Sequence, residues 1–186
     1  MADTQYLSLL RGINVGGKNI IKMADLKVCF EGMDFSDVAT FIQSGNVLFS
    51  STEKDKLKLT KQIEKMLSER FRYSSRVVVV SHKELQKIVE GAPKGFGKAP
   101  DKYRYDVIFL KEPLTPAEAM EKVTTKEGVD HVYQGKSALY FSRLISKATQ
   151  SRLPRIIALP VYQYMTIRNW STTTKLLAMM EKTHEK

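Results

Sequence analysis

The sequence predicts an α+β fold made of two consecutive copies of a βαββαβα unit, packed as one compact globule. Strand and helix patterns follow in the same order in both halves, and matching elements lie about 90 residues apart. A stretch rich in Gly, Pro and Lys separates the halves. We therefore predict a first unit at 1–91, a connecting loop at 92–102 and a second unit at 103–186. The halves show no visible sequence identity, so this prediction depends on element order.

Local signals define the elements of the first half. A helix from about Met23 carries Leu26, Cys29 and Phe30 on one side and stops at Gly32. The remaining elements predicted here are strands at 6–13, 37–43, 46–50 and 77–80, with a hairpin turn at Ser44-Gly45, an amphipathic helix through Leu59, Ile63, Met66, Leu67 and Phe71, and a helix that starts at a capping box formed by Ser81 and Glu84.

The second half repeats this order. Thr115, Pro116 and Glu118 supply the cap, the first-turn proline and the third-position acid of a helix. The other elements predicted here are strands at 103–110, 129–134, 137–142 and 164–168, a less regular helical stretch at about 144–158, and a final helix from about Ser171.

Composition places the chain among folded globular proteins. Hydrophobic residues make up 42% and charged residues 27% of its 186 residues. The only cysteine, Cys29, excludes an internal disulfide and lies on the apolar face of a predicted helix. We find neither a secretory signal pattern nor a membrane-spanning run. We therefore expect a cytoplasmic protein without a membrane partner.

The net charge is +10 and its distribution is uneven. No Asp or Glu occurs between Asp130 and Glu181. Basic groups without neutralising carboxylates create a positive field, which favours anionic partners. The alternative is that a basic chain contains such a window by chance. The basic residues of this window are Lys136, Arg143, Lys147, Arg152, Arg155, Arg168 and Lys175.

The segment RGINVGGKN, residues 11–19, lies where a strand ends and the chain turns toward a helix. Backbone N–H groups at Gly16 and Gly17 could line a concavity, with charge from Arg11 and Lys18 and a donor from Asn14. This arrangement suits an oxygen anion such as phosphate. The alternative is a tight loop that needs positive φ at both glycines, and the two readings stay open. The spacing is that of neither a P-loop nor GxGxxG.

The segment TIRNWSTTTK, residues 166–175, is again a strand followed by a helix. It offers more cap-forming side chains than one helix needs, which indicates an anion site at the helix N-terminus. The alternative is a redundant cap beside a core tryptophan. The residues concerned are Arg168, Asn169, Trp170, Ser171, Thr172, Thr173 and Lys175.

Other functional signals are weak. Lys94-Gly95-Phe96-Gly97 begins like the RNP1 signature of RRM domains, but Lys98 stands where an aromatic residue belongs and the flanking prolines exclude a central strand. We therefore do not expect RRM-type stacking. The three histidines show no metal-ligand spacing, no general acid–base pair can be assigned, and we predict no metal and no cofactor.

Three motifs together carry a resemblance over essentially the whole chain. LLRGINVGGKN, QSGNVLF and TIRNW resemble a widespread, mostly bacterial family known only as a domain of unknown function. The resemblance implies a ferredoxin-like α+β architecture and a cytoplasmic setting but no known activity, cofactor or catalytic residues. Together with the repeated element order, it predicts two consecutive ferredoxin-like (βαββαβ) units, each followed by a helix. The motif positions are Arg11, Gly12, Asn14, Gly16, Gly17, Ser44, Gly45, Asn46, Arg168, Asn169 and Trp170.

These observations favour a binder of a phosphorylated or other anionic ligand, such as a nucleotide or a nucleic-acid backbone, held by the two turns on a common face. Arg11, Lys18, Arg168 and Lys175 would supply charge. The donors would be Asn14, Asn169, Thr172 and Thr173, with Ser44 and Asn46 as further candidates from the motif. An enzyme acting on a phosphorylated small molecule and a protein-interaction scaffold are the alternatives. The sequence does not indicate an oligomeric state.

Overall fold

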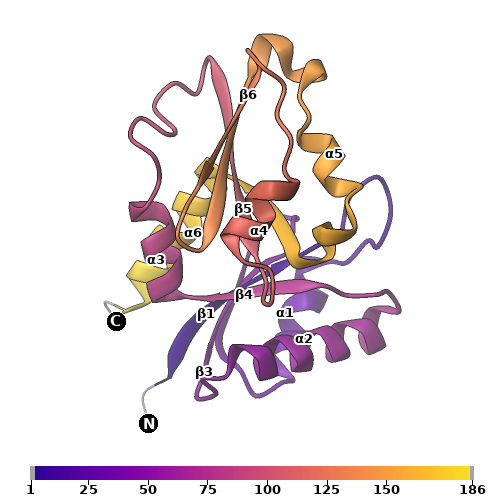
Figure 1. Cartoon of the computed structure of the whole chain (residues 1–186). Coiled ribbons are helices and arrows are strands. Elements are labelled where there is room, and N and C mark those ends of the chain that lie inside the picture. Colours follow the sequence, from indigo (N-terminus) through magenta and orange to yellow (C-terminus); the bar gives the residue numbers. More distant parts are fainter. Residues whose placement is uncertain (1–2, 185–186) are drawn as a thin grey trace. The chain divides into compact units, whose positions relative to one another are not determined.

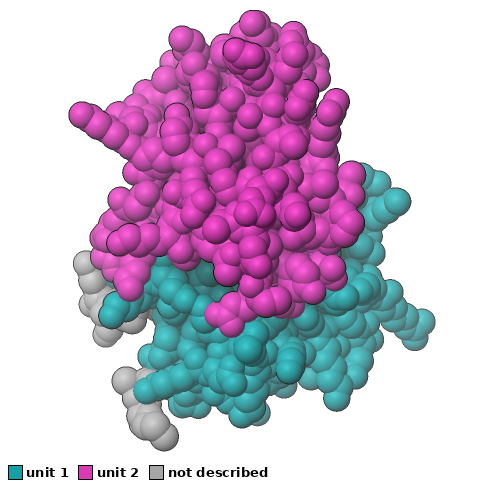
Figure 2. All heavy atoms as spheres, in the orientation of Figure 1, with its two compact units in different colours: residues 1–85, 180–186 teal, residues 86–179 magenta. Residues whose placement is uncertain are grey.

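The computed structural model describes residues 3–184, and the side chains of residues 3–182. The chain forms two compact units, one of residues 1–85 with 180–186 and one of residues 86–179 (Figure 2). The domain boundary expected at 92–102 stays a prediction.

Each unit contains a four-stranded antiparallel sheet. The strand orders are β2-β3-β1-β4 in the first sheet and β6-β7-β5-β8 in the second. In both units the first and third strands are therefore central, and the second and fourth form the edges. The chain is thus a mixed α+β protein (Figure 1). The strands are β1 (Thr4–Leu10), β2 (Ser36–Phe41), β3 (Asn46–Ser51), β4 (Val77–Ser81), β5 (Tyr103–Leu110), β6 (Asp130–Gln134), β7 (Ala138–Leu144) and β8 (Met165–Asn169).

The helices follow the predicted order. They are α1 (Met23–Glu31), α2 (Lys56–Phe71), α3 (His82–Glu90), α4 (Pro116–Lys122), α5 (Leu153–Ile157) and α6 (Trp170–His184), with 3₁₀ segments η1 (Ile145–Gln150) and η2 (Pro160–Tyr164). Among the described residues, no helix combines the length and apolar character needed to cross a membrane.

Two predicted elements differ from the structure. The strand expected at 6–13 ends at Leu10, because positive φ angles at Gly12 (73°) and Asn14 (53°) turn the chain away from an extended path. The helical stretch expected at 144–158 is divided into η1 and α5, with η2 following. A proline lies in the first turn of α5 and another in that of η2, where the missing N–H prevents the preceding turn from continuing.

The core of the first unit lies between one face of its sheet and helices α1 and α2 (Figure 1). Phe49 on β3 contacts Phe35 with ring centroids 4.4 Å apart and Phe30 of α1 at 5.6 Å. Leu59 and Ile63 of α2 are fully buried in the same cluster. The aromatic contacts add to the stabilisation from buried area.

The core of the second unit is formed by every second side chain of its strands, all on one face of the sheet. Ile108 of β5, Leu139 and Phe141 of β7 and Met165 of β8 pack with Ala119 of α4 in one buried cluster. Successive side chains of a strand point to opposite faces of the sheet. The intervening residues of β5, β6 and β7 therefore lie on the other face, which carries the candidate site.

Both predicted capping boxes are confirmed. The backbone N of Ser81 donates to Glu84 Oε2 at 2.8 Å, and the backbone N of Glu84 donates to Ser81 Oγ at 3.3 Å. Thr115 and Glu118 make the equivalent pair at the start of α4. Lys56 of α2 also forms an ion pair with Glu84. The Glu84 carboxylate therefore connects α2 to the start of α3.

We predict that Glu84→Gln weakens this connection in a pH-dependent way. Burial raises the pKa of Glu84, but hydrogen bonds from Lys56 and Ser81 outweigh it and lower the pKa overall. The contribution of the carboxylate is therefore present above its ordinary pKa of 4.5 and is lost as pH falls through the lower folded-state pKa. At pH 7 the variant should lose up to about 1 kcal/mol in free energy of unfolding, measured with urea.

The difference between wild type and Glu84→Gln should shrink when the urea series is repeated at acidic pH. The exposed Glu121→Gln is the matched control and should change stability little at either pH. A difference that grows on acidification would contradict the assignment of the lowered pKa to Glu84.

Candidate functional site

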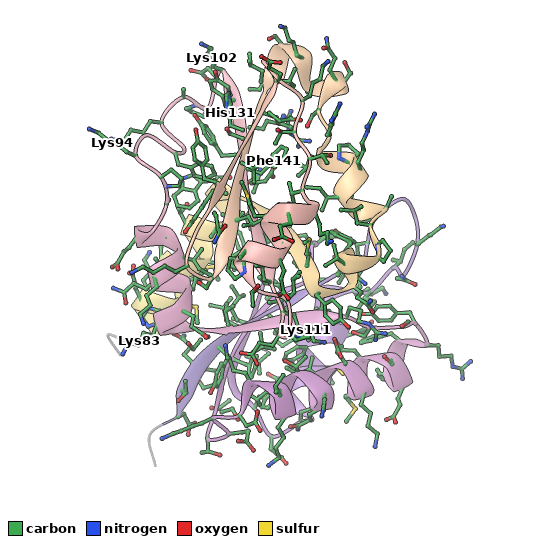
Figure 3. All side chains as sticks on the ribbon, viewed as in Figure 1. Lys83, Lys94, Lys102, Lys111, His131 and Phe141 are labelled. Atoms are coloured by element: carbon green, nitrogen blue, oxygen red, sulfur yellow. The ribbon has the colours of Figure 1, made fainter. Side chains whose placement is uncertain are left out.

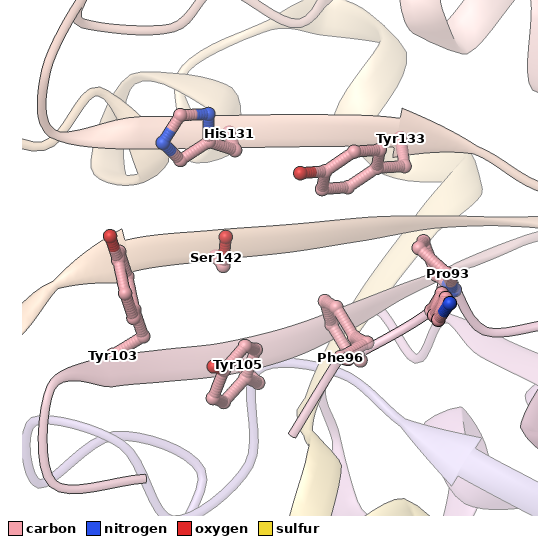
Figure 4. Close-up of a pocket in the computed structure, with 9 residues that line it drawn as sticks. Pro93, Phe96, Tyr103, Tyr105, His131, Tyr133 and Ser142 are labelled. Carbon is pink, nitrogen blue, oxygen red and sulfur yellow. The ribbon is translucent and has the colours of Figure 1, made fainter. Parts of the chain in front are cut away.

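A row of side chains crosses three strands of the second sheet on the face opposite its core. Tyr105 of β5 pairs with Ser142 of β7, and His131 of β6 pairs with the same serine from the other side. One step along, Tyr133 pairs with Tyr140. Strand register therefore brings aromatic residues from distant parts of the sequence onto one surface (Figure 4).

This surface is hollowed into a cavity of about 230 Å³, which we call the aromatic groove. Tyr133 is 45% exposed and His131 is also exposed, so the groove opens to solvent on the side of β6. The loop before β5 closes another side with Pro93 and Phe96 (Figure 4). Its lining is Pro93, Lys94, Gly95, Phe96, Tyr103, Tyr105, His131, Tyr133 and Ser142.

Phe96 anchors the closing loop. Its ring centroid lies 4.9 Å from that of Tyr105, 5.5 Å from that of Tyr140 and 5.2 Å from that of Trp170, each in an edge-to-face arrangement. Gly97 has a φ of 81°, and a Cβ built there would lie 2.3 Å from Trp170 Nε1. Glycine at 97 therefore permits the indole to pack directly against the loop.

The floor of the groove contains a serine hydroxyl. Ser142 is only 5% exposed, and no hydrogen bond of its Oγ is found within the described part of the chain. Tyr103 stands beside it, with its ring centroid 6.5 Å from that of His131 and 6.1 Å from that of Tyr105. The rings of Tyr103, Tyr105 and His131 thus surround a polar floor.

Two lysines lie at the rim of the groove. Lys94 belongs to its lining, and Lys102 Nζ lies 5.5 Å from the centroid of the Tyr103 ring, within cation–π range. Both lysines extend into solvent from the loop before β5 (Figure 3). None of the residues that line the groove is acidic. Elsewhere among residues 3–182, no three His, Cys, Asp or Glu side chains are grouped as metal ligands.

The predicted segment 11–19 forms a small hairpin in the first unit. Gly16 and Gly17 have φ angles of 58° and 73°, and Lys18 N donates to Val15 O at 3.1 Å. Positive φ at both central residues is the pattern of a type I′ turn. The expected positive φ at the glycines is therefore confirmed. Lys18 is exposed and Arg11 is half-buried.

Asn14 holds this hairpin in place through all of its side-chain hydrogen-bonding groups. Its Nδ2 donates to the carbonyls of Ile21 (3.0 Å) and Gln43 (2.9 Å), and its Oδ1 accepts from Ile21 N at 2.8 Å. The Gln43 bond connects the hairpin to the turn between β2 and β3. The structure therefore brings two of the three sequence motifs together within the first unit.

The Ser44-Gly45-Asn46 turn is packed beneath that hairpin. Asn46 is fully buried and its Nδ2 donates to Phe41 O (3.0 Å) and Ser44 Oγ (2.9 Å). Gly45 has a φ of 74°, and its carbonyl accepts from Leu10 N at 2.8 Å. The side chains of Ser44 and Asn46 thus interact with each other across the turn.

Most polar side chains of the 166–175 segment form hydrogen bonds within the segment itself. Asn169 Oδ1 accepts from Thr172 N (3.3 Å) and Ser171 Oγ (2.7 Å), so Asn169 caps α6. The buried Thr173 donates its hydroxyl to Asn169 O at 3.0 Å. Lys175 is exposed. The surplus hydroxyls therefore largely satisfy backbone and cap groups of their own helix.

Arg168 and Trp170 are held inside the second unit. Arg168 is 9% exposed and its Nη1 donates to Ile167 O at 2.9 Å. Burial lowers the pKa of Arg168 to about 10, so the group stays charged at neutral pH. Trp170 is half-buried beside Phe96. A common face for the 11–19 and 166–175 turns stays a prediction.

Sequence reasoning missed the residues of the aromatic groove. The sequence did contain a pattern that indicates this groove. Aromatic residues occur two positions apart, as Tyr103 with Tyr105 and His131 with Tyr133, and this spacing places both side chains of a pair on one face of a strand. The four residues of the RNP1-like stretch at 94–97 lie in a loop, as predicted. The stacking residues come instead from β5 and β6.

Comparison with known proteins decides the family. The family model described as "Protein of unknown function (DUF1697)" matches residues 4–140. The chain belongs to this family. The match includes the DUF1697 segments 11–19 and 44–46 and ends before 166–175.

A solved structure supports the fold of this DUF1697 protein. The conserved bacterial protein SP0830 from Streptococcus pneumoniae is similar with a TM-score of 0.83 and 26% sequence identity, over 96% of this chain and 99% of that chain. No curated protein matches the chain. The family and its structural relative thus bring no assigned function to the groove.

We predict that Gly45→Ala destabilises the protein strongly. A Cβ there would lie 2.7 Å from Leu10 Cβ and 2.8 Å from Ile13 Cδ1, at a positive φ. The left-handed conformation costs roughly 1–2 kcal/mol and overpacking roughly 1–3 kcal/mol, so we expect about 2–5 kcal/mol in urea denaturation.

The matched control for Gly45→Ala is Gly16→Ala. Gly16 also has positive φ, but no atom lies within 4 Å of an added Cβ. It should show only the conformational cost of about 1–2 kcal/mol. Equal losses in the two variants would contradict the packing of Gly45 against the hairpin.

Proposed function

We propose that this protein binds a nucleotide or single-stranded nucleic acid in the aromatic groove. The observation that carries the proposal is the presentation of Tyr103, Tyr105, His131 and Tyr133 on the part of one sheet face that lines the aromatic groove. Unstacked bases bind proteins by stacking on such rings, and each stacked base contributes about 1–3 kcal/mol.

The charge around the groove supports an anionic ligand. Lys94 and Lys102 stand at the rim, and no carboxylate lines the groove to repel phosphate. Lysine binds phosphate as a point charge and needs no fixed geometry, which suits the flexible backbone of a single strand. The base of a nucleotide would stack on the rings inside the groove, and its phosphate would contact the lysines at the rim.

The open groove favours binding over catalysis. An enzyme acting on a phosphorylated small molecule would gain from a closed pocket that excludes water. Here Tyr133 and His131 border solvent, so a strand can enter from the side of β6. This geometry supports the nucleic-acid form of the proposed function.

The anion-binding role of the loop side chains remains part of the proposal, and it rests chiefly on Lys18 and Lys175, which are exposed. Arg11 is half-buried, and Arg168 is buried beside the Ile167 carbonyl. The remaining residues of the expected set, Asn14, Gly16, Gly17, Ser44, Asn46, Asn169, Trp170, Thr172 and Thr173, shape the turns that carry these charges.

We also propose that each unit is a ferredoxin-like βαββαβ motif, so that the chain contains an internal duplication. The equivalent strand orders β2-β3-β1-β4 and β6-β7-β5-β8 support this proposal, because each sheet inserts its third strand between its first and second. Four-stranded units of this kind can stack bases on a sheet face. Base stacking is proposed here contrary to the expectation from the RNP1-like stretch, and it uses β5 and β6 residues in the groove instead of that stretch.

A cytoplasmic setting belongs to the same proposal. The only cysteine, Cys29, is buried, and burial raises the pKa of its thiol despite the opposing charge of Arg70. A single buried thiol of this kind suits a reducing compartment.

We predict that the double variant His131→Ala/Tyr133→Ala loses nucleic-acid binding. Both side chains are exposed on an edge strand, so their removal should leave the fold intact. Fluorescence anisotropy with a labelled mixed-sequence single-stranded 12-mer should show at least about a tenfold weaker Kd, since the substitutions remove two stacking surfaces.

The control is Tyr164→Ala, which removes a half-buried tyrosine of the same unit from outside the aromatic groove. It should bind like wild type. Binding that does not weaken in the double variant would contradict the groove as the site. A wild-type affinity that stays constant across a salt series would contradict phosphate contacts by the rim lysines.

A further inference from the structure

Ser142 supplies the groove floor with a hydroxyl that makes no hydrogen bond within the described part of the chain. Ser142 lies between Tyr105 and His131 in the strand register and is 5% exposed. No hydrogen bond to its hydroxyl is present among the described residues, and the residue lines the cavity (Figure 4). Ser142 Oγ is not one of the fully buried side-chain atoms that lack a partner, so it opens into the cavity, where a ligand group can form a hydrogen bond with it.

The size of the groove limits what can reach this hydroxyl. Pockets for drug-sized ligands enclose roughly 300–1,000 Å³, whereas the groove encloses about 230 Å³. Aromatic side chains form most of its wall, and Phe96 closes one side in contact with Trp170. The space therefore suits a single planar ring system inserted between rings.

We infer that the groove holds one nucleobase at a time and that Ser142 selects among bases by a hydrogen bond to the inserted edge. This inference rests on the proposed function and adds the residue that determines specificity. The rings of Tyr103, Tyr105 and His131 stack with any base, because every base has a π face. Discrimination must then come from polar groups; the Tyr105 hydroxyl already accepts a hydrogen bond from Ala99 N, whereas the Ser142 hydroxyl opens into the cavity.

A hydroxyl in this position can discriminate for a physical reason. Serine can donate or accept, but the surrounding rings restrict the orientation in which a base edge meets it. A base that presents a matching group completes the hydrogen bond. A base that presents a C–H or a methyl group covers the hydroxyl without forming a hydrogen bond with it, which weakens binding.

The test compares wild type and Ser142→Ala with labelled dA10, dC10 and dT10 by fluorescence anisotropy. Wild type should prefer at least one oligonucleotide over another. In Ser142→Ala the ratio between the best and worst Kd should fall by about two- to tenfold, the effect of one net hydrogen bond. The worst-bound oligonucleotide should bind at least as tightly as it does to wild type, because stacking is retained and no hydroxyl is left without a partner.

Exposed Ser146→Ala is the matched control and should keep the wild-type ratio. Unchanged fluorescence of Trp170, the only tryptophan, verifies that the variants are folded. Equal wild-type affinities for the three oligonucleotides, or an unchanged ratio in Ser142→Ala, would overturn the role of Ser142 and leave the binding proposal standing. Failure of wild type to bind any oligonucleotide would instead overturn the proposed function.

Discussion

The contact between Gly97 and Trp170 is the constraint on which the candidate site depends. A side chain at 97 would overlap the indole, since even a Cβ would approach Trp170 Nε1 to 2.3 Å. With glycine there, Trp170 packs beside the loop and Phe96 turns inward against Tyr105 and Tyr140. The loop is thereby fixed at one side of the groove, where Pro93 and Phe96 belong to the lining.

The alternation of the second sheet explains how one set of strands serves both stability and the proposed binding. Ile108 and Phe141 point into the core with α4 and α5, while Tyr105 and Ser142 point the other way from the same two strands. A register shift of a single residue would exchange these faces. The buried core therefore holds the groove residues in register, although it does not contact a ligand.

The sequence predicted what local chemistry determines. The capping boxes at Ser81 and Thr115 follow from residue spacing within one turn, and both are present. The groove could not be predicted in the same way, because Tyr105, His131 and Ser142 become neighbours only through strand order. At 166–175 the sequence overestimated the free donors, because hydroxyls such as that of Thr173 bond to carbonyls one helical turn earlier.

The most direct test of the central claim is a ¹H–¹⁵N NMR titration of the full chain with an unlabelled trinucleotide. The account predicts the largest shift changes at backbone amides of β5, β6 and β7 near Tyr105, His131 and Ser142, with saturation at a single Kd. Shift changes confined to the hairpin at residues 14–19, or no change at saturating trinucleotide, would contradict the aromatic groove as the binding site.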